Sequence, residues 1–98
     1  MKALPFKIPK TDESSIRMQV DHQPYFYDIL HQHPEIQITL ILSGTGTIFQ
    51  GDYIGQFKPG DVFWIGANVP HVLRCDQAHY QIGTLKKAHA VSLFFDRN

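Results

Sequence analysis

The segment from His31 to Leu42 alternates polar and aliphatic side chains, and this alternation constrains the fold more than any other feature of the chain. The odd positions up to 39 carry His31, His33, Glu35, Gln37 and Thr39, while the even positions from 36 to 42 are all Ile or Leu. Because successive side chains of a β-strand point to opposite faces, a strand at 35–42 has one polar and one wholly aliphatic face. Buried imidazoles and amides need hydrogen bonds or ligation, so the pattern predicts either a polar barrel lumen or a solvated polar face over an ordinary aliphatic core.

The rest of the chain has the composition of an all-β domain. From about residue 16, short runs rich in Ile, Val, Phe, Tyr and Thr are separated by Gly, Pro, Asn and Asp, and no segment sustains a helical period. These runs predict strands at 16–20, 25–31, 35–42, 46–50, 53–57, 61–65, 71–75, 80–85 and 89–95. Pro59-Gly60 is typical of a type II turn with glycine at the positive-φ position. Residues 1–15 are expected to form an extended arm whose Leu4, Phe6 and Ile8 contact a barrel made by residues 16–98.

Length and composition exclude several classes of protein. A chain of 98 residues is one small domain, and its nine basic and nine acidic residues provide no positive surface for nucleic acid. Cys75 is the only cysteine, which excludes an intrachain disulfide and a cysteine-built zinc site. The apolar stretches are too short for a membrane span, and the first residues lack the apolar core of a signal peptide. A cytoplasmic protein with no membrane partner is therefore expected.

Two ordered motifs resemble those of cupin barrels: His31-x-His33-x3-Gln37-x6-Gly44, with glutamine where that motif has glutamate, and Gly60-Asp61-x9-His71. More narrowly, five segments resemble the N-terminal effector-binding and dimerisation domain of AraC-family transcription regulators; they are His31–Gln37, Gly44–Gly46, Gly51–Tyr53, Phe57–Asp61 and Ile65–His71. The resemblance implies a single-domain jelly-roll barrel that binds a small effector, such as a sugar, in its lumen. It also implies a fragment of a longer regulator, whose C-terminal helix-turn-helix domain reads DNA.

The resemblance and the strand parity together indicate a set of candidate ligand-binding residues: His31, His33, Gln37, Thr39, Trp64 and His71. For Trp64 the alternative is an ordinary core position, and for His71 it is a buried histidine bonded to a carbonyl. The cupin metal set would fall on His31, His33, Gln37 and His71. A glutamine amide is a weaker ligand than a carboxylate, so no cofactor is expected, although three histidines can still hold a divalent transition metal.

Two functional classes follow from these residues. The first is a non-enzymatic sensing domain with no catalytic residues. The second is a metal-dependent small cupin enzyme of the isomerase or dioxygenase type, in which Glu35 would be the nearest available acid or base. Gln37 in the glutamate position favours the first.

The aliphatic row at Ile36, Ile38, Leu40 and Leu42 predicts an interface if the histidine face points inward. An outward apolar row of this size needs a cover. The cover would be the N-terminal arm, a second subunit or helices of a longer chain, and a homodimer is expected.

Overall fold

The computed structural model describes residues 4–5 and 16–96, which form two β-sheets and a single turn of 3₁₀ helix. The strands are β1 (Leu4–Pro5), β2 (Ile16–Gln23), β3 (His31–Gln32), β4 (Ile36–Ser43), β5 (Gly46–Gln50), β6 (Tyr53–Phe57), β7 (Val62–Ile65), β8 (His71–Cys75) and β9 (Ala88–Phe95), and the 3₁₀ helix η1 is Gln77–Tyr80. Within these described ranges no helix has the length and apolarity to cross a bilayer.

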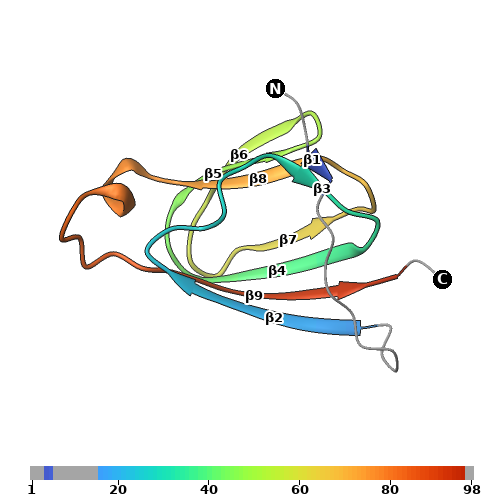
Figure 1. Cartoon of the computed structure of the whole chain (residues 1–98), viewed down its shortest axis with the longest axis horizontal. Helices are drawn as coiled ribbons and strands as arrows, with labels where there is room; N and C mark the ends of the chain where they lie inside the picture. Colours follow the sequence, from blue (N-terminus) through green and yellow to red (C-terminus); the bar gives the residue numbers. More distant parts are fainter. Residues whose placement is uncertain (1–3, 6–15, 97–98) are drawn as a thin grey trace.

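The two sheets lie face to face and form the walls of a flattened barrel (Figure 1). One sheet has the order β1-β3-β8-β5-β6 and the other β2-β9-β4-β7. Among the described strands every pairing is antiparallel except that of β1 with β3, which places the backbone of Leu4 opposite His31. The predicted all-β fold is confirmed.

The burial of side chains along β4 shows which face of this alternating strand points into the barrel. Gln37, Thr39 and Ile41 are buried between the sheets, whereas Leu40 and Leu42 are exposed on the outside. The polar face therefore lines the barrel interior, and the aliphatic face is the outer one.

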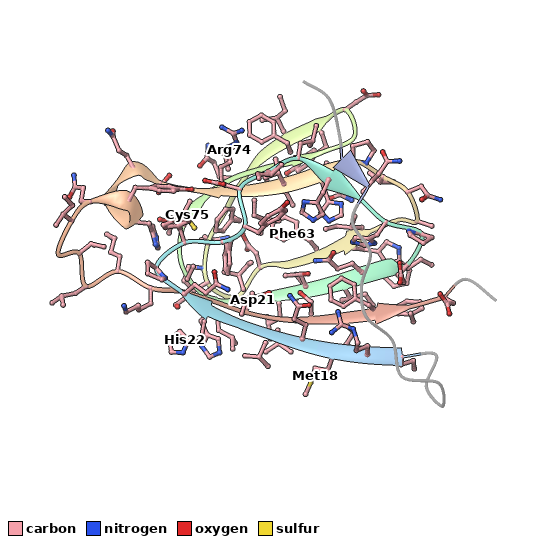
Figure 2. All side chains as sticks on the ribbon, viewed as in Figure 1. Met18, Asp21, His22, Phe63, Arg74 and Cys75 are labelled. Carbon is pink, nitrogen blue, oxygen red and sulfur yellow. The ribbon has the colours of Figure 1, made fainter. Side chains whose placement is uncertain are left out.

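An apolar core and a polar region occupy different ends of the interior. The core cluster is formed by Phe26, Ile41, Ile48, Phe57, Leu73, Cys75, Ala88 and Ala90, with Phe63 packed against it. Along β8 the chain runs from His71 in the polar region to Cys75 in the core, which Figure 2 shows at the end nearer η1. Burial of the apolar side chains at one end of the barrel stabilises the fold through the hydrophobic effect. The other end can therefore hold polar side chains that add little to that stabilisation.

Two predicted strands are wrong. Only His31 of the segment 25–31 is in a strand, and residues 80–85 belong to η1 and an exposed loop. In the first segment only Phe26 is buried, with its N–H donating to Cys75 Sγ at 3.4 Å. The buried His79 of η1, just before the second segment, has its Nδ1 2.8 Å from the carbonyl oxygen of Pro24, just before the first, and this contact joins the two irregular regions.

The other predicted strands agree with the structure to within a few residues at each end. Gly60 has φ of +92°, as the predicted Pro59-Gly60 turn requires. Of the predicted arm contacts, Leu4 is paired through its backbone with His31, and Phe6 and Ile8 lie outside the described residues.

Candidate ligand-binding site

Three histidines from distant parts of the chain meet at the polar end of the barrel. His31 on β3 is the register partner of His71 on β8, and their ring centroids are 4.3 Å apart. The ring of His33, which follows β3, lies 4.9 Å from that of His71. One ring nitrogen of each histidine lies within 4.8 Å of one ring nitrogen of each of the others. The predicted convergence of these residues is confirmed.

Each imidazole is oriented by a nearby backbone carbonyl. Nδ1 of His31 is 2.7 Å from the Ile29 oxygen, and Nδ1 of His71 is 2.8 Å from the Val69 oxygen. The loop that carries Val69 is itself tied to the site, because Asn68, at φ of +58°, donates its N–H to the His33 carbonyl at 2.7 Å. A neutral imidazole that donates through Nδ1 has its lone pair on Nε2, so this scaffold sets the tautomer of each ring.

A chain of polar contacts crosses the interior from His33 to β9. His33 Nε2 lies 3.0 Å from Gln37 Oε1, Gln37 Nε2 donates to Thr39 Oγ1 at 2.7 Å, and Thr39 Oγ1 lies 2.8 Å from Ser92 Oγ. All four side chains are buried. The chain joins β4 to β9 across the inner surface and supplies a continuous row of polar atoms.

His33 makes two contacts that a neutral ring cannot satisfy together. Its Nδ1 is 3.0 Å from the Glu35 carbonyl oxygen while its Nε2 faces Gln37 Oε1, yet a neutral imidazole has only one N–H. Turning the Gln37 amide over lets its NH₂ donate to His33, while the Thr39 hydroxyl donates to Oε1. Gln37 is therefore the adjustable member of the site.

Burial keeps two of the three histidines neutral. Desolvation lowers the pKa of His71 from 6.5 to about 4, and the hydrogen bond to Val69 opposes this only in part. Desolvation is also the main reason why the pKa of His31 is lowered. At neutral pH these two rings are uncharged and act as hydrogen-bonding or ligating groups.

The polar residues surround a cavity between the two sheets with a volume of about 260 Å³. This is just below the range of roughly 300–1,000 Å³ that is usual for small-molecule sites. Its apolar lining is Phe26, Tyr27, Leu73, Ala90 and Phe94. Its polar lining is Gln19, Asp21, Gln23, His31, His33, Gln37, Thr39, His71 and Ser92. The mixture can hold a small molecule that has both hydroxyl groups and apolar surface.

Strand β2 adds cavity residues that the sequence analysis did not identify. Gln19 Nε2 donates to both carboxylate oxygens of Asp21, at 3.0 and 3.2 Å, and Gln19 Oε1 accepts from Arg17 Nη2 at 3.1 Å. Figure 2 shows Asp21 directed between the sheets, and among the described residues of the lining it is the only Asp, Glu, Lys or Arg. Residues 16–23 carry the same alternation as residues 35–42, so strand parity was the signal that could have found them.

Trp64 and Glu35 do not join the cavity. Trp64 is paired in register with Ile38, which faces outward, and 60% of Trp64 is exposed on that outer face. The predicted place of Trp64 in the ligand pocket is thus wrong, because Phe63 and Ile65 are the inward residues of β7. Glu35 is buried but is not among the lining residues. The ligand-binding role of His31, His33, Gln37, Thr39 and His71 stays a prediction.

The histidine cluster fits the donor requirements of a divalent transition metal. His71 is 1% exposed and its Nε2 has no hydrogen-bond partner. The Nδ1 contacts to backbone carbonyls are the outer contacts that metal-binding histidines commonly make. With the carbonyl of Gln37 the donor set is four neutral groups, which holds a metal less strongly than a set with a carboxylate.

Comparisons with known proteins agree with this architecture. The family model described as the AraC-like ligand binding domain matches residues 15–85. No curated protein sequence matches the chain.

Several solved structures share the fold. A cupin 2 conserved barrel domain protein from Rhodopseudomonas palustris has a TM-score of 0.66 and 15% identity over 90% of this chain and 57% of its own. A cupin protein from Bacteroides fragilis has a TM-score of 0.66 and 15% identity over 100% of this chain and 88% of its own. A DMSP lyase from Ruegeria pomeroyi has a TM-score of 0.61 and 21% identity over 85% of this chain and 39% of its own. This chain thus spans little more than half of the first protein's length, and the predicted cupin barrel is confirmed.

Proposed function

Because this chain belongs to the family of AraC-like ligand binding domains, we propose that it is the small-molecule-sensing domain of a transcription regulator. Its ligand is an uncharged, hydroxyl-bearing metabolite such as a sugar, bound in the cavity between the sheets. DNA is then read by a helix-turn-helix domain outside residues 1–98, and the protein acts in the cytoplasm.

The observation that carries the proposal is the polar row from His33 through Gln37 and Thr39 to Ser92 on the cavity wall. Amides and hydroxyls both donate and accept, so they match ligand hydroxyl groups, which do the same. Phe94 adds an aromatic surface to the same wall, and aromatic faces pack well against the apolar C–H surface of a sugar.

The charge of the lining indicates which ligands are disfavoured. Burial keeps His31 and His71 neutral at pH 7, and the described residues of the lining include Asp21 but no lysine or arginine that could hold a phosphate or carboxylate. A sugar phosphate should therefore bind more weakly than the sugar itself.

A thermal-shift screen of pentoses, hexoses and sugar alcohols, each beside its phosphorylated form, tests the proposal. Ligand at a hundredfold excess over its dissociation constant stabilises the fold by about 2.7 kcal/mol. Gln37→Ala should reduce the shift measured against its own unliganded melting temperature. Gln56→Ala removes the same amide from an exposed site on β6 and should not. A screen with no stabilising neutral compound, or equal shifts in the two variants, would contradict the proposal.

The histidine cluster favours a second candidate, a metal-dependent small cupin enzyme. His31, His33 and His71 would hold the metal, with Gln37 as a fourth donor, and the metal would supply Lewis-acid activation of a bound oxygen. The likeness to a lyase structure is one of fold alone. Metal analysis after dialysis against a mild chelator separates the candidates: we expect less than one equivalent to remain, because all donors are neutral. Retention of a full equivalent, lost in His71→Ala, would support the enzyme.

A further inference from the structure

The segment between β2 and β3, residues 24–30, lies along one side of the cavity, and we call it the strap. It runs from the end of β2 in one sheet to the start of β3 in the other (Figure 1). Phe26 and Tyr27 of the strap are lining residues of the cavity. Tyr27 is also 48% exposed, so the cavity approaches solvent at this side chain. The strap is therefore the wall that separates the cavity from solvent on this side.

The two halves of the strap differ in how deeply they are buried. Phe26 belongs to the apolar core, and its N–H donates to Cys75 Sγ at 3.4 Å. Beyond Phe26, the side chains of Tyr27 and Ile29 are only about half buried. Moving residues 27–30 outward would therefore expose less new apolar surface than moving Phe26. Phe26 is thus a fixed point of the strap, and residues 27–30 are the part that can open locally.

A single side chain of η1 contacts the strap on both sides of Phe26. The ring of Tyr80 stacks on that of Tyr25, with centroids 4.3 Å apart, and its hydroxyl donates to Asp28 Oδ2 at 3.1 Å. Desolvation and the hydrogen bond to Asp28 raise the pKa of Tyr80 to about 12, so the hydroxyl keeps the proton that it donates. The buried His79 fixes η1 against the start of the strap. The strap is therefore held to η1 by side chains.

On its inner side the strap contacts the histidine cluster. The ring of Tyr27 lies edge-on to that of His31, with centroids 5.2 Å apart, and the Ile29 carbonyl oxygen is 2.7 Å from His31 Nδ1. The ring of His71 lies next to that of His31 and is 1% exposed. The position of residues 27–30 thus decides how well the cluster is covered on this side.

We propose that residues 27–30 are a gate to the cavity and that Tyr80 is the positioning residue that holds the gate shut. When the contacts of Tyr80 with Tyr25 and Asp28 break, residues 27–30 move outward about Phe26 and a small molecule can reach the cavity. Entry and exit both pass through this open state, so Tyr80 sets both rates without contacting the ligand itself. The proposal concerns access to the cavity and does not depend on which molecule binds there.

Acylation of His71 by diethyl pyrocarbonate, located by mass spectrometry of the digested protein, tests the gate without any ligand. The reagent attacks neutral imidazole nitrogens. Burial keeps His71 neutral at pH 7, and its Nε2 has no hydrogen-bond partner among the described residues. Its reaction is therefore limited by access, once any bound metal has been removed with a chelator. The exposed His22 is the internal standard within each protein.

The variants separate the two contacts of Tyr80. Tyr80→Ala removes both and should speed the modification of His71 relative to His22 by roughly 10-fold. Tyr80→Phe keeps the stack and should speed it by roughly threefold. Asp28→Ala removes the same hydrogen bond, so the double variant should react no faster than Tyr80→Phe alone. Tyr53→Ala removes a half-exposed tyrosine from β6, away from the strap, and should leave the rate unchanged.

Three results would overturn the proposal. The first is an equal rate at His71 in wild type and Tyr80→Ala, and the second is the same increase in Tyr53→Ala. The third is an increase no larger than that of the globally unfolded fraction, which urea unfolding of each variant measures. If Tyr80→Ala does not fold, unchanged rates in both Tyr80→Phe and Asp28→Ala would overturn it. Failure of the gate would leave the proposed function standing, because the assay contains no ligand.

Discussion

His71 should make the stability of this domain depend on pH between about 6.5 and 4. Its ring is buried and its Nε2 has no hydrogen-bond partner, so protonation would place a cation among the neighbouring rings of His31 and His33. Burial lowers its pKa to about 4 in the folded chain. In the unfolded chain the pKa returns to about 6.5, so the unfolded state binds the extra proton first as the pH falls.

The sign and size of the effect follow from this difference. Above about pH 6.5 the ring is neutral in both the folded and the unfolded state, so its titration does not change the free energy of unfolding. Between that pH and about 4 only the unfolded state gains the proton, and the free energy of unfolding falls by about 3 kcal/mol. Below about pH 4 both states bind the proton, and this ring lowers the free energy of unfolding no further. His31, with a pKa lowered in the same direction, adds to the slope.

Urea unfolding at fixed pH values from about 7.5 to 4 measures the effect. His71→Gln removes the titrating group, so this variant should lose the greater part of the slope that wild type shows below pH 6.5. His22→Gln removes an exposed histidine outside the cavity and should keep the slope. An unchanged slope in His71→Gln would refute the reasoning, because carboxylate titration is common to all three proteins.

Two further predictions concern the interior. Thr39→Val should lower the free energy of unfolding by about 1–3 kcal/mol, because it leaves the buried Gln37 amide and Ser92 hydroxyl unpaired. Thr47→Val, on the outward side of β5, should lower it less, and equal losses in the two variants would count against the polar row. Gly46→Ala should lower the free energy of unfolding by about 3 kcal/mol or more, because a Cβ there would overlap the backbone carbonyl of Arg74. Gly66→Ala would meet only the Val69 side chain and should lower it less, and chemical denaturation of both variants checks which loss is larger.

Strand parity predicted the inward face of β4 because a β-strand has a fixed two-residue period, and Gln37 and Thr39 on that strand both face the cavity. His31 on β3 and His33 after it belong to the other side of the barrel, so the cupin-like motif, and not a common strand, is what predicted their place beside Gln37. Parity alone does not say which face is inside. That depends on the partners of β4 in the sheet, which no local pattern encodes.

The wrong predictions, for Trp64 and for the segment 25–31, also arise because tertiary partners decide what the local pattern leaves open. In β7 both parities are apolar, Val62 and Trp64 on one face and Phe63 and Ile65 on the other, so there was no contrast from which to place Trp64. The segment 25–31 has strand-forming residues but only His31 finds a partner strand, since a strand needs pairing as well as propensity.

The central claim, that the barrel cavity binds a small uncharged ligand, is tested most directly by histidine NMR. The probe is the neutral sugar or sugar alcohol that gives the largest thermal shift. The account predicts that the imidazole resonances of His33 and His71 move together and saturate at one equivalent, because both rings line the cavity. Those of His22 and His89, whose stacked rings lie outside the cavity lining, should stay in place. Movement of the outer pair alone, or no movement while the probe still stabilises the fold, would contradict the claim.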